Sequence, residues 1–293
     1  MSKNWTEKHI YTLMVIPLMA FIVLLVAFPL GYTVYLSLTE WSMGTTAPVW
    51  SGLDNYRTIL TDGRFWSGTR NTLYIAFGSV AVEMVLGTVI ALILNRPFAG
   101  KNLVKTLFLL PMVATPIAVG MVWQLIYEPT MGVANYLLKA IGLDPVLWLV
   151  DMDKVLSSLA LIEVWEWTPM VMLIVLAGLA GIPQDVYESA RVDGAGRWAL
   201  LTRITLPMLA PTLIITALLR IIDALKTFDI IYATTQGGPL QASETVNLLA
   251  YSTIFKYFKM GQGAALIICF LVEIGLCCAL MVVLRSRVRE RVS

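Results

Sequence analysis

Six long apolar stretches dominate this sequence, and they constrain its fold more than any other feature. A helix crosses the hydrocarbon core of a bilayer with about 20 mostly apolar residues. Only 14% of the 293 residues are charged, against about 25% in soluble domains, and the mean hydropathy is +0.77. We therefore predict an all-α integral membrane protein with six transmembrane helices, at roughly residues 10–38, 71–94, 106–127, 155–180, 208–231 and 262–284.

The same composition excludes several classes of protein. A net charge of +2 gives no strong field for nucleic acid, so we expect none as a partner. The three cysteines share one apolar run, which does not fit a disulfide framework, and the single histidine, His9, excludes a histidine-rich metal site. We interpret residues 1–293 as a single membrane domain. Its first stretch is expected to be a retained anchor, because the apolar run is too long for the core of a signal peptide.

Lysine and arginine predict the orientation of the spans. If the N-terminus is cytoplasmic, the inner segments are richer in basic residues than the outer loops, and the basic C-terminal tail is also inside. Both termini are therefore expected in the cytoplasm.

One inner segment, from Gly181 to Pro207, is longer than the others. Pro183 suits the first turn of a helix, and Gly194 suits the position after its last turn. A second helical stretch is expected from Arg197 toward Pro207. This helix–turn–helix would either lie on the lipid headgroups or dock a soluble cytoplasmic partner.

The residues of this segment resemble a known signature. Glu188-Ser189-Ala190, Gly194 and the later Ile204-x-Leu206-Pro207 match the EAA loop of the membrane subunits of bacterial ABC importers, with Ser189 where that family usually has alanine. Flanking residues are similar to the maltose-type permeases for carbohydrates. Further segments agree with that branch: Arg70-Asn71-Thr72, Leu109-Leu110-Pro111, Gly132-x-x-Asn135, Phe228-Asp229 and Gly237-Gly238-Pro239.

The resemblance implies an architecture and a set of partners. It implies a type I importer permease fold in the bacterial inner membrane, with a second homologous permease subunit, two ATPase subunits and an extracytoplasmic solute-binding protein. ATP and Mg²⁺ would be bound by the ATPases, since this chain has no P-loop motif and no catalytic constellation, and we expect it not to be an enzyme. The residues implied in ATPase coupling are Tyr187, Glu188, Ser189, Ala190, Asp193, Gly194, Ile204, Leu206 and Pro207.

Charged residues inside the apolar stretches are costly in lipid, so they are expected to face the protein interior or a water-filled path. Arg220, Asp223, Lys226 and Asp229 alternate in sign at three-residue spacing and could neutralise one another along one helix stripe. They either pair structurally or line the translocation path. The residues considered for the path are Glu163, Trp165, Glu166, Arg220, Asp223, Lys226 and Tyr232.

The remaining features of the spans are interpreted structurally. Glu83 and Glu273 stand alone in their stretches and are expected to form hydrogen bonds between helices, and Asp223 is expected to matter more than Glu273. Small residues allow helices to approach closely. Close packing is expected at Gly78, Gly87, Gly178 and Gly181.

Two other functions remain open from the residues. One is an ABC permease for a phosphorylated polyol, which would need unpaired basic groups in its cavity. The other is a proton-coupled secondary transporter that uses Glu163, Glu166 and Asp223 as relay groups. Such carriers often contain inverted repeats, and none is evident in this sequence.

Overall fold

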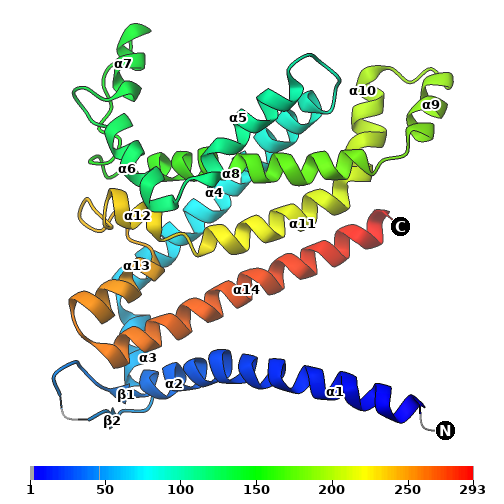
Figure 1. Ribbon diagram of the computed structural model, residues 1–293. Coiled ribbons are helices and arrows are strands. Elements are labelled where there is room, and N and C mark those ends of the chain that lie inside the picture. The colour runs from blue at the N-terminus through cyan, green and yellow to red at the C-terminus, as the bar shows by residue number, and fades with distance from the viewer. Residues whose placement is uncertain (1–2, 46, 293) are drawn as a thin grey trace. The chain divides into compact units, whose positions relative to one another are not determined.

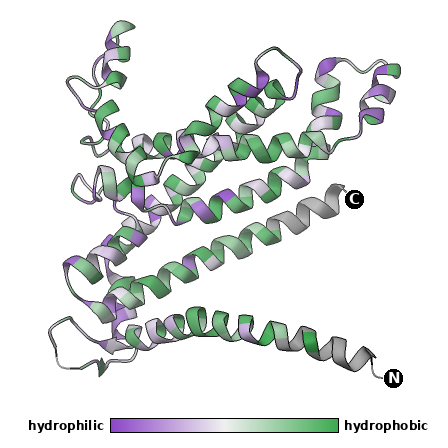
Figure 2. Cartoon of the chain, in the orientation of Figure 1, coloured by the Kyte–Doolittle hydropathy of each residue, from purple (hydrophilic) through white to green (hydrophobic). Residues whose placement is uncertain are grey.

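Long apolar helices form the frame of the molecule. The computed structural model describes residues 3–45 and 47–292, and within them five helices are long and apolar enough to cross a membrane. A sixth span is possible if one bent helix pair is counted. Figure 2 shows the hydrophobic residues running along these helices, whereas hydrophilic residues gather in connections such as α9 (Gln184–Val192).

The described chain forms two compact units. The smaller unit comprises residues 1–65 and 249–273, and the larger one residues 66–248 and 274–293. Three helices run from one unit into the other: α4 (Gly63–Leu94), α13 (Val246–Tyr251) and α14 (Met260–Val292).

The smaller unit contains the N-terminal helical run and a short hydrogen-bonded segment after it. Asn55 donates to the carbonyls of Ser37 and Thr39 at 2.9 Å each, and Tyr56 shares a hydrogen bond of 2.6 Å with Ser37. These bonds fix the end of the N-terminal run. The elements that lie wholly in the smaller unit are α1 (Lys3–Ile22), the π-helical turn η1 (Val23–Ala27), α2 (Phe28–Ser37), β1 (Thr39–Glu40), β2 (Val49–Trp50), α3 (Asp54–Thr61) and the π-helical turn η3 (Ser252–Lys256). The strands β1 and β2 are antiparallel.

The larger unit is built around α8. This helix packs against α5 and α11, and α12 packs on α6 (Figure 1). The elements that lie wholly in the larger unit are α5 (Lys101–Val113), α6 (Pro116–Ile126), α7 (Val133–Ala140), α8 (Val155–Ala180), α9, α10 (Arg197–Ala199), the π-helical turn η2 (Leu200–Thr205), α11 (Leu206–Leu225) and α12 (Asp229–Thr234).

Two glycines allow the main helices of this unit to touch. A Cβ on Gly87 would lie 2.6 Å from the Val171 side chain of α8, and one on Gly178 would lie 2.9 Å from Thr212 of α11. The expectation of close packing is wrong for Gly78, since no heavy atom lies within 4 Å of its Cβ position among the described residues. At Gly181 the nearest atom is only the carbonyl of Gly178, 3.4 Å away.

The third predicted span is not one straight helix. The helices α5 and α6 meet at a bend of 98° across Ala114 and Thr115. Pro116 explains the break, because the residue before a proline is driven out of the helical region. Thr115 accordingly has an extended backbone, with φ −71° and ψ 139°.

Two π-helical turns lie just before prolines. The turn η1 precedes Pro29, and η2 precedes Pro207. A proline gives no N–H to the carbonyl four residues earlier, and a local switch to wider hydrogen bonding accommodates this. Leu206 thus donates to the carbonyl of Leu201, five residues back. The helical run from Arg197 to Leu225 therefore continues without interruption, beginning earlier than the predicted fifth span.

A buried asparagine organises the connection between α6 and α8. Asn135 has no exposed surface and donates to the carbonyls of Pro129 and Val146, while its own oxygen accepts from Val146 and Trp148. Gly132 is required nearby, because a Cβ there would collide with the carbonyl of Glu128. This explains the Gly132-x-x-Asn135 pattern in the sequence.

The contrast between the two glycines of α4 gives a matched test. Gly87→Ala should lower the thermal unfolding midpoint of the purified protein, because Val171 cannot move away without separating α4 from α8. Overpacking of this kind typically costs about 1–3 kcal/mol. Gly78→Ala serves as the control and should leave the midpoint unchanged or raise it slightly. Equal midpoints for the two variants would refute the close approach.

Candidate functional site

A fully buried arginine joins three helices in the larger unit. The Nε of Arg220 in α11 donates to Glu83 Oε2 of α4 at 2.8 Å, and its Nη2 donates to Glu83 Oε1 at 3.2 Å. The same Nη2 donates to Glu163 Oε1 of α8 at 3.1 Å. The guanidinium carbon lies 4.7 Å from the centre of the Trp167 ring. We call Arg220, Glu83 and Glu163 the charge triad.

The triad compensates a charge that is costly to bury. Arg220 and Glu83 are 0% exposed and Glu163 is 2% exposed. A buried charge is tolerated only when it is paired and hydrogen-bonded, and the bidentate contact with Glu83 provides the strongest form of such a pair. The expectation of a helix–helix hydrogen bond for Glu83 is confirmed, and its partner is the arginine of α11.

Not every polar atom around the triad is satisfied. Within the part of the chain that the structure describes, Glu166 Oε2 and Arg220 Nη1 are buried and form no hydrogen bond. Buried polar atoms without a partner are rare in proteins. These two atoms indicate a place for water or for a ligand hydroxyl.

A polar cavity of about 140 Å³ lies beside the triad. Pockets for small molecules are typically about 300–1,000 Å³, so this cavity is too small to enclose a sugar by itself. It provides one wall of hydrogen-bonding and aromatic groups. The lining residues are Pro116, Glu163, Trp167, Arg220, Asp223, Lys226, Thr227, Phe228, Asp229 and Ile230.

The charge pattern of α11 differs from the predicted ladder. Arg220 pairs across helices with Glu83 and Glu163, while Lys226 pairs with Asp223 at 3.2 Å near the surface. The side chain of Lys226 is 52% exposed and that of Asp223 is 46% exposed. Exposed ion pairs of this kind contribute little to stability. The ladder prediction is confirmed for Asp223 and Lys226 but is wrong for Arg220, which pairs across helices. It does not extend to Asp229, because α11 ends at Leu225 and the chain turns before that residue.

The other residues considered for the path are distributed around this cavity. Trp165 is 44% exposed and lies on the side of α8 away from this cavity. Its ring packs edge-on against that of Trp123, with ring centres 5.6 Å apart. Tyr232 stacks on Phe228 with ring centres 5.4 Å apart and so supports one wall of the cavity. Glu163, Arg220, Asp223 and Lys226 are brought together, but Trp165 is not part of their cavity.

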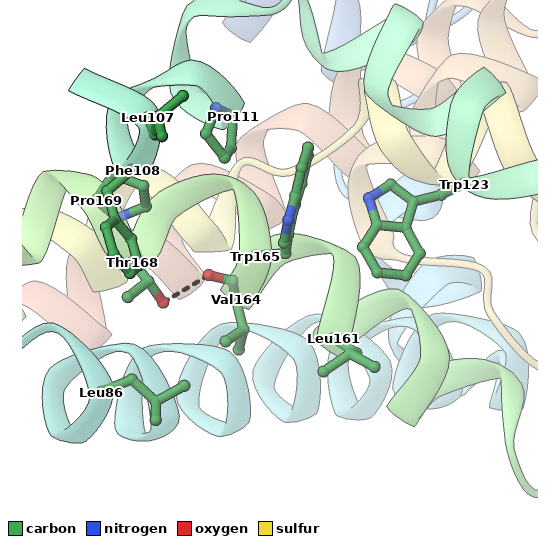
Figure 3. A pocket seen from close by; sticks show the side chains of 10 residues that line it. All are labelled: Leu86, Leu107, Phe108, Pro111, Trp123, Leu161, Val164, Trp165, Thr168 and Pro169. Carbon is green, nitrogen blue, oxygen red and sulfur yellow. Dashed lines mark hydrogen bonds between the residues drawn. The ribbon is translucent and has the colours of Figure 1, made fainter. Parts of the chain in front are cut away.

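An apolar groove of about 520 Å³ lies on that opposite side of α8 (Figure 3). Thr168 donates to the carbonyl of Val164 at 2.6 Å, which satisfies its hydroxyl within the helix. The walls are otherwise almost entirely apolar and offer a hydroxyl-rich molecule few partners. The lining residues are Leu86, Leu107, Phe108, Pro111, Trp123, Leu161, Val164, Trp165, Thr168 and Pro169.

The inner segment forms the predicted helix, glycine turn and second helix. The helix α9 ends in a Schellman motif, in which Ala195 N donates to the carbonyl of Ala190 at 2.9 Å and Gly194 N to that of Arg191 at 3.0 Å. Gly194 has φ +81°, and no heavy atom lies within 4 Å of its Cβ position among the described residues. The requirement for glycine here comes from the backbone conformation alone.

The two faces of α9 have different surroundings. Tyr187 packs against the core of α4, α8 and α11, and its hydroxyl shares a hydrogen bond of 3.2 Å with Thr205. Glu188 lies on the exposed side, and Val192 is 87% exposed. The exposed face of α9 thus presents Glu188 and the apolar side chain of Val192.

The remaining residues implied in coupling fall into two groups. Ser189 and Asp193 are exposed, and the hydroxyl of Ser189 donates back to the carbonyl of Asp185 at 2.8 Å. Ala190 is half-buried. In the second group, Ile204 in η2 and Leu206 at the start of α11 are half-buried, and Pro207 is exposed.

Several residues of the site were not predicted from the sequence. Thr227 and Trp167 line the polar cavity, and Glu83 completes the triad. One signal was available for Glu83, because the apolar stretches contain few cations that could neutralise it. Thr227 gave no signal, since its role depends on the break between α11 and α12.

Comparisons with known proteins agree with this architecture. The family described as binding-protein-dependent transport system inner membrane component matches residues 83–291. A probable ABC transporter permease protein, y4oQ, of Sinorhizobium fredii is 40% identical over 85% of this chain and 81% of its own length. The trehalose/maltose transport system permease protein MalF of Thermococcus litoralis is 36% identical over 89% of this chain and 90% of its own.

A solved structure matches nearly the whole fold. It is a bacterial alginate ABC transporter, crystallised with an alginate pentasaccharide-bound periplasmic protein. The TM-score is 0.83 over 98% of this chain and 97% of that chain, at 22% sequence identity. The predicted class, an all-α membrane protein with the fold of an ABC importer permease, is confirmed.

The chain therefore belongs to the family of inner membrane components of binding-protein-dependent transport systems. It is a multi-pass permease subunit of an ABC importer, and its role is transport and not catalysis.

The triad predicts that Glu83 contributes more to stability than Asp223 does. Glu83→Ala should sharply reduce the yield and thermal stability of the purified subunit, because removing one partner of a buried pair costs about 3–5 kcal/mol. Asp223→Ala breaks only an exposed pair and should cost about 1 kcal/mol or less. Glu83→Gln, which keeps the size and one acceptor oxygen, should fall between them. Equal losses for Glu83→Ala and Asp223→Ala would contradict the triad's role.

Proposed function

We propose that this permease moves a neutral sugar or polyol, and that the polar cavity beside the charge triad forms one wall of its path. Trp167 and Phe228 offer aromatic faces, while Asp223, Thr227 and Asp229 offer hydrogen-bonding groups. Sugars present both hydroxyls and apolar C–H faces, and this wall is complementary to both. The small volume of the cavity means that the rest of the path must come from another subunit.

Among relatives, the Thermococcus protein named for trehalose and maltose transport supports a carbohydrate cargo. The pairing of charges favours a neutral one. Arg220 is neutralised by two glutamates and Lys226 lies 3.2 Å from Asp223. A phosphorylated polyol would require cations without carboxylate partners in the cavity, so we consider it the weaker alternative.

We further propose that α9 is the contact for the ATPase subunit. Glu188 and Val192 on its exposed face would dock in a cleft of that subunit, with Glu188 forming a charge-assisted hydrogen bond to a basic group. Gly194 permits the sharp turn that leads back into the membrane. Ser189, Ala190 and Asp193 belong to the same contact, while Ile204, Leu206 and Pro207 carry the chain into α11.

A continuous helical run connects this contact to the cavity. From Arg197 to Leu225 the chain is helical through α10, η2 and α11, and Arg220 lies near the end of that run. A displacement of α9 by a closing ATPase would be carried along α11 to the triad. Because the triad also fixes α4 and α8, these three helices are expected to move as one body.

The partners follow from the same reasoning. We propose a complex with a second homologous permease subunit, two ATPase subunits that bind ATP and Mg²⁺, and an extracytoplasmic solute-binding protein. Docking of a cytoplasmic ATPase on α9 requires the inner segment, and with it both termini, to be cytoplasmic. A proton-coupled secondary transporter would need none of these partners.

The glycine turn provides a matched pair of variants for testing the coupling contact. Gly194→Val places a branched side chain at φ +81° and should greatly reduce sugar uptake by the reconstituted importer. It should leave membrane insertion intact, because insertion depends on the apolar spans. Gly196→Val is the control, since Gly196 has φ −73° and open space around it, and should transport normally.

Charge reversal tests the docking residue itself. Glu188→Lys should reduce co-purification of the ATPase and the ATP hydrolysis stimulated by the binding protein. Asp144→Lys reverses an exposed charge in the α7–α8 connection and should change neither. Full ATPase binding and normal uptake by both Glu188→Lys and Gly194→Val would rule out α9 as the coupling contact.

A further inference from the structure

A second polar cavity lies beside α9, on the face that carries Gln184, Tyr187 and Arg191. It has a volume of about 840 Å³ and belongs entirely to the larger unit. Its walls come from the end of α4 and the turn after it, from α8, from α9, and from the α10–η2 segment. Apart from Tyr187, which the family resemblance implies in coupling, the residues of the proposed path and of the proposed ATPase contact do not line this cavity.

Three arginines from three separate segments line this cavity. Arg96 follows the last turn of α4, Arg191 lies in the last turn of α9, and Arg197 begins α10. Among the described residues that line it, none is an aspartate or a glutamate. The amides of Asn95 and Gln184 add further donors. Several arginines that line one cavity without carboxylates are suited to a phosphate group.

The rest of the lining is apolar. Leu92, Leu179, Leu200 and Leu201 contribute aliphatic surface beside the arginines, and Leu179 is 4% exposed. Trp198, which also lines the cavity, is 75% exposed. Tryptophan is enriched at the level of lipid headgroups. An anionic phospholipid has both an anionic headgroup and apolar chains, and it matches a cavity lined by arginines and leucines.

Helix geometry places this cavity next to the proposed docking residues. Gln184, Tyr187 and Arg191 are spaced three and four residues apart, so they form one stripe of α9 that lines the cavity. Glu188 is four residues from Gln184 and three from Arg191, so it borders that stripe. A ligand in the cavity would therefore lie beside an ATPase bound at Glu188.

We propose that this cavity binds the phosphate group of an anionic phospholipid of the membrane, with Arg96, Arg191 and Arg197 as its ligands. The acyl chains extend along the leucines, and Trp198 lies at the headgroup level. The bound lipid supports α9 on this face, so the position of the coupling helix depends on it. This site does not rest on the identity of the cargo.

The test uses the full chain purified with its partner subunits in mild detergent. Native mass spectrometry counts the molecules of phosphatidylglycerol that remain bound, with phosphatidylcholine as the neutral comparison. Each of Arg96→Gln, Arg191→Gln and Arg197→Gln should weaken retention of phosphatidylglycerol by about fivefold, as expected for about 1 kcal/mol per basic residue at an anionic lipid surface. Arg203→Gln removes the same charge from the same segment but not from the lining, and should have no effect.

A second arm locates the lipid and identifies its source. Phosphatidylglycerol brominated near the headgroup should quench part of the tryptophan fluorescence, and Trp198→Phe should remove that part. Inorganic phosphate at millimolar concentration should not displace the lipid. Equal retention in Arg203→Gln and the three lining variants would overturn the proposal. Displacement of the lipid by free phosphate would also overturn it and would indicate a soluble ligand. Loss of the lipid whenever the ATPase binds would overturn it as well, and would indicate that an acidic surface of that subunit fills the cavity.

Discussion

A positive charge buried within membrane helices requires anionic partners close by, and the contact of Arg220 with Glu83 and Glu163 is the interaction on which this structure depends. It links α4, α8 and α11, three helices that are distant in sequence. Gly87 and Gly178 bring the same helices together at other levels. Without the triad, a desolvated guanidinium would separate these helices or draw water between them. With it, a polar wall can exist beside an otherwise apolar core.

The same helix that carries Arg220 also connects the two functional regions. The run from Arg197 to Leu225 starts at the glycine turn after α9 and ends at the polar cavity. Its π-helical turn before Pro207 preserves continuity where proline would otherwise interrupt the hydrogen bonds. The proposed lipid cavity and the proposed ATPase contact lie on neighbouring faces of α9, so both would act on one short helix.

Much of this could be predicted from the sequence, because the length of apolar runs and the chemistry of turns are local properties. The fold class, the helix–turn–helix of the inner segment and the role of Gly194 followed from such local rules. The partner of Arg220 could not be predicted in this way. Asp223 is three residues away and within reach on the same helix, yet Arg220 pairs with Glu83 on another helix. The bend at Thr115 was signalled by Pro116, but the apolar pattern across it favoured one helix. The start of α4 at Gly63 was also missed, because Asp62 caps its first turn by accepting from Arg64 N at 2.9 Å, in a polar stretch with no apolar periodicity.

The central claim is that sugar passes beside the charge triad, and Thr227 in the cavity wall is the place to measure it. In a chain whose cysteines Cys269, Cys277 and Cys278 are replaced by serine, Thr227→Cys can be labelled with a membrane-impermeant thiol reagent in proteoliposomes that contain the whole importer. The labelling rate should change when ATP and the loaded binding protein drive turnover, and a transported sugar should slow it. Thr58→Cys, at an exposed position of the polar helix α3, should show no such dependence. A labelling rate at position 227 that is indifferent to ATP, binding protein and sugar would contradict the account.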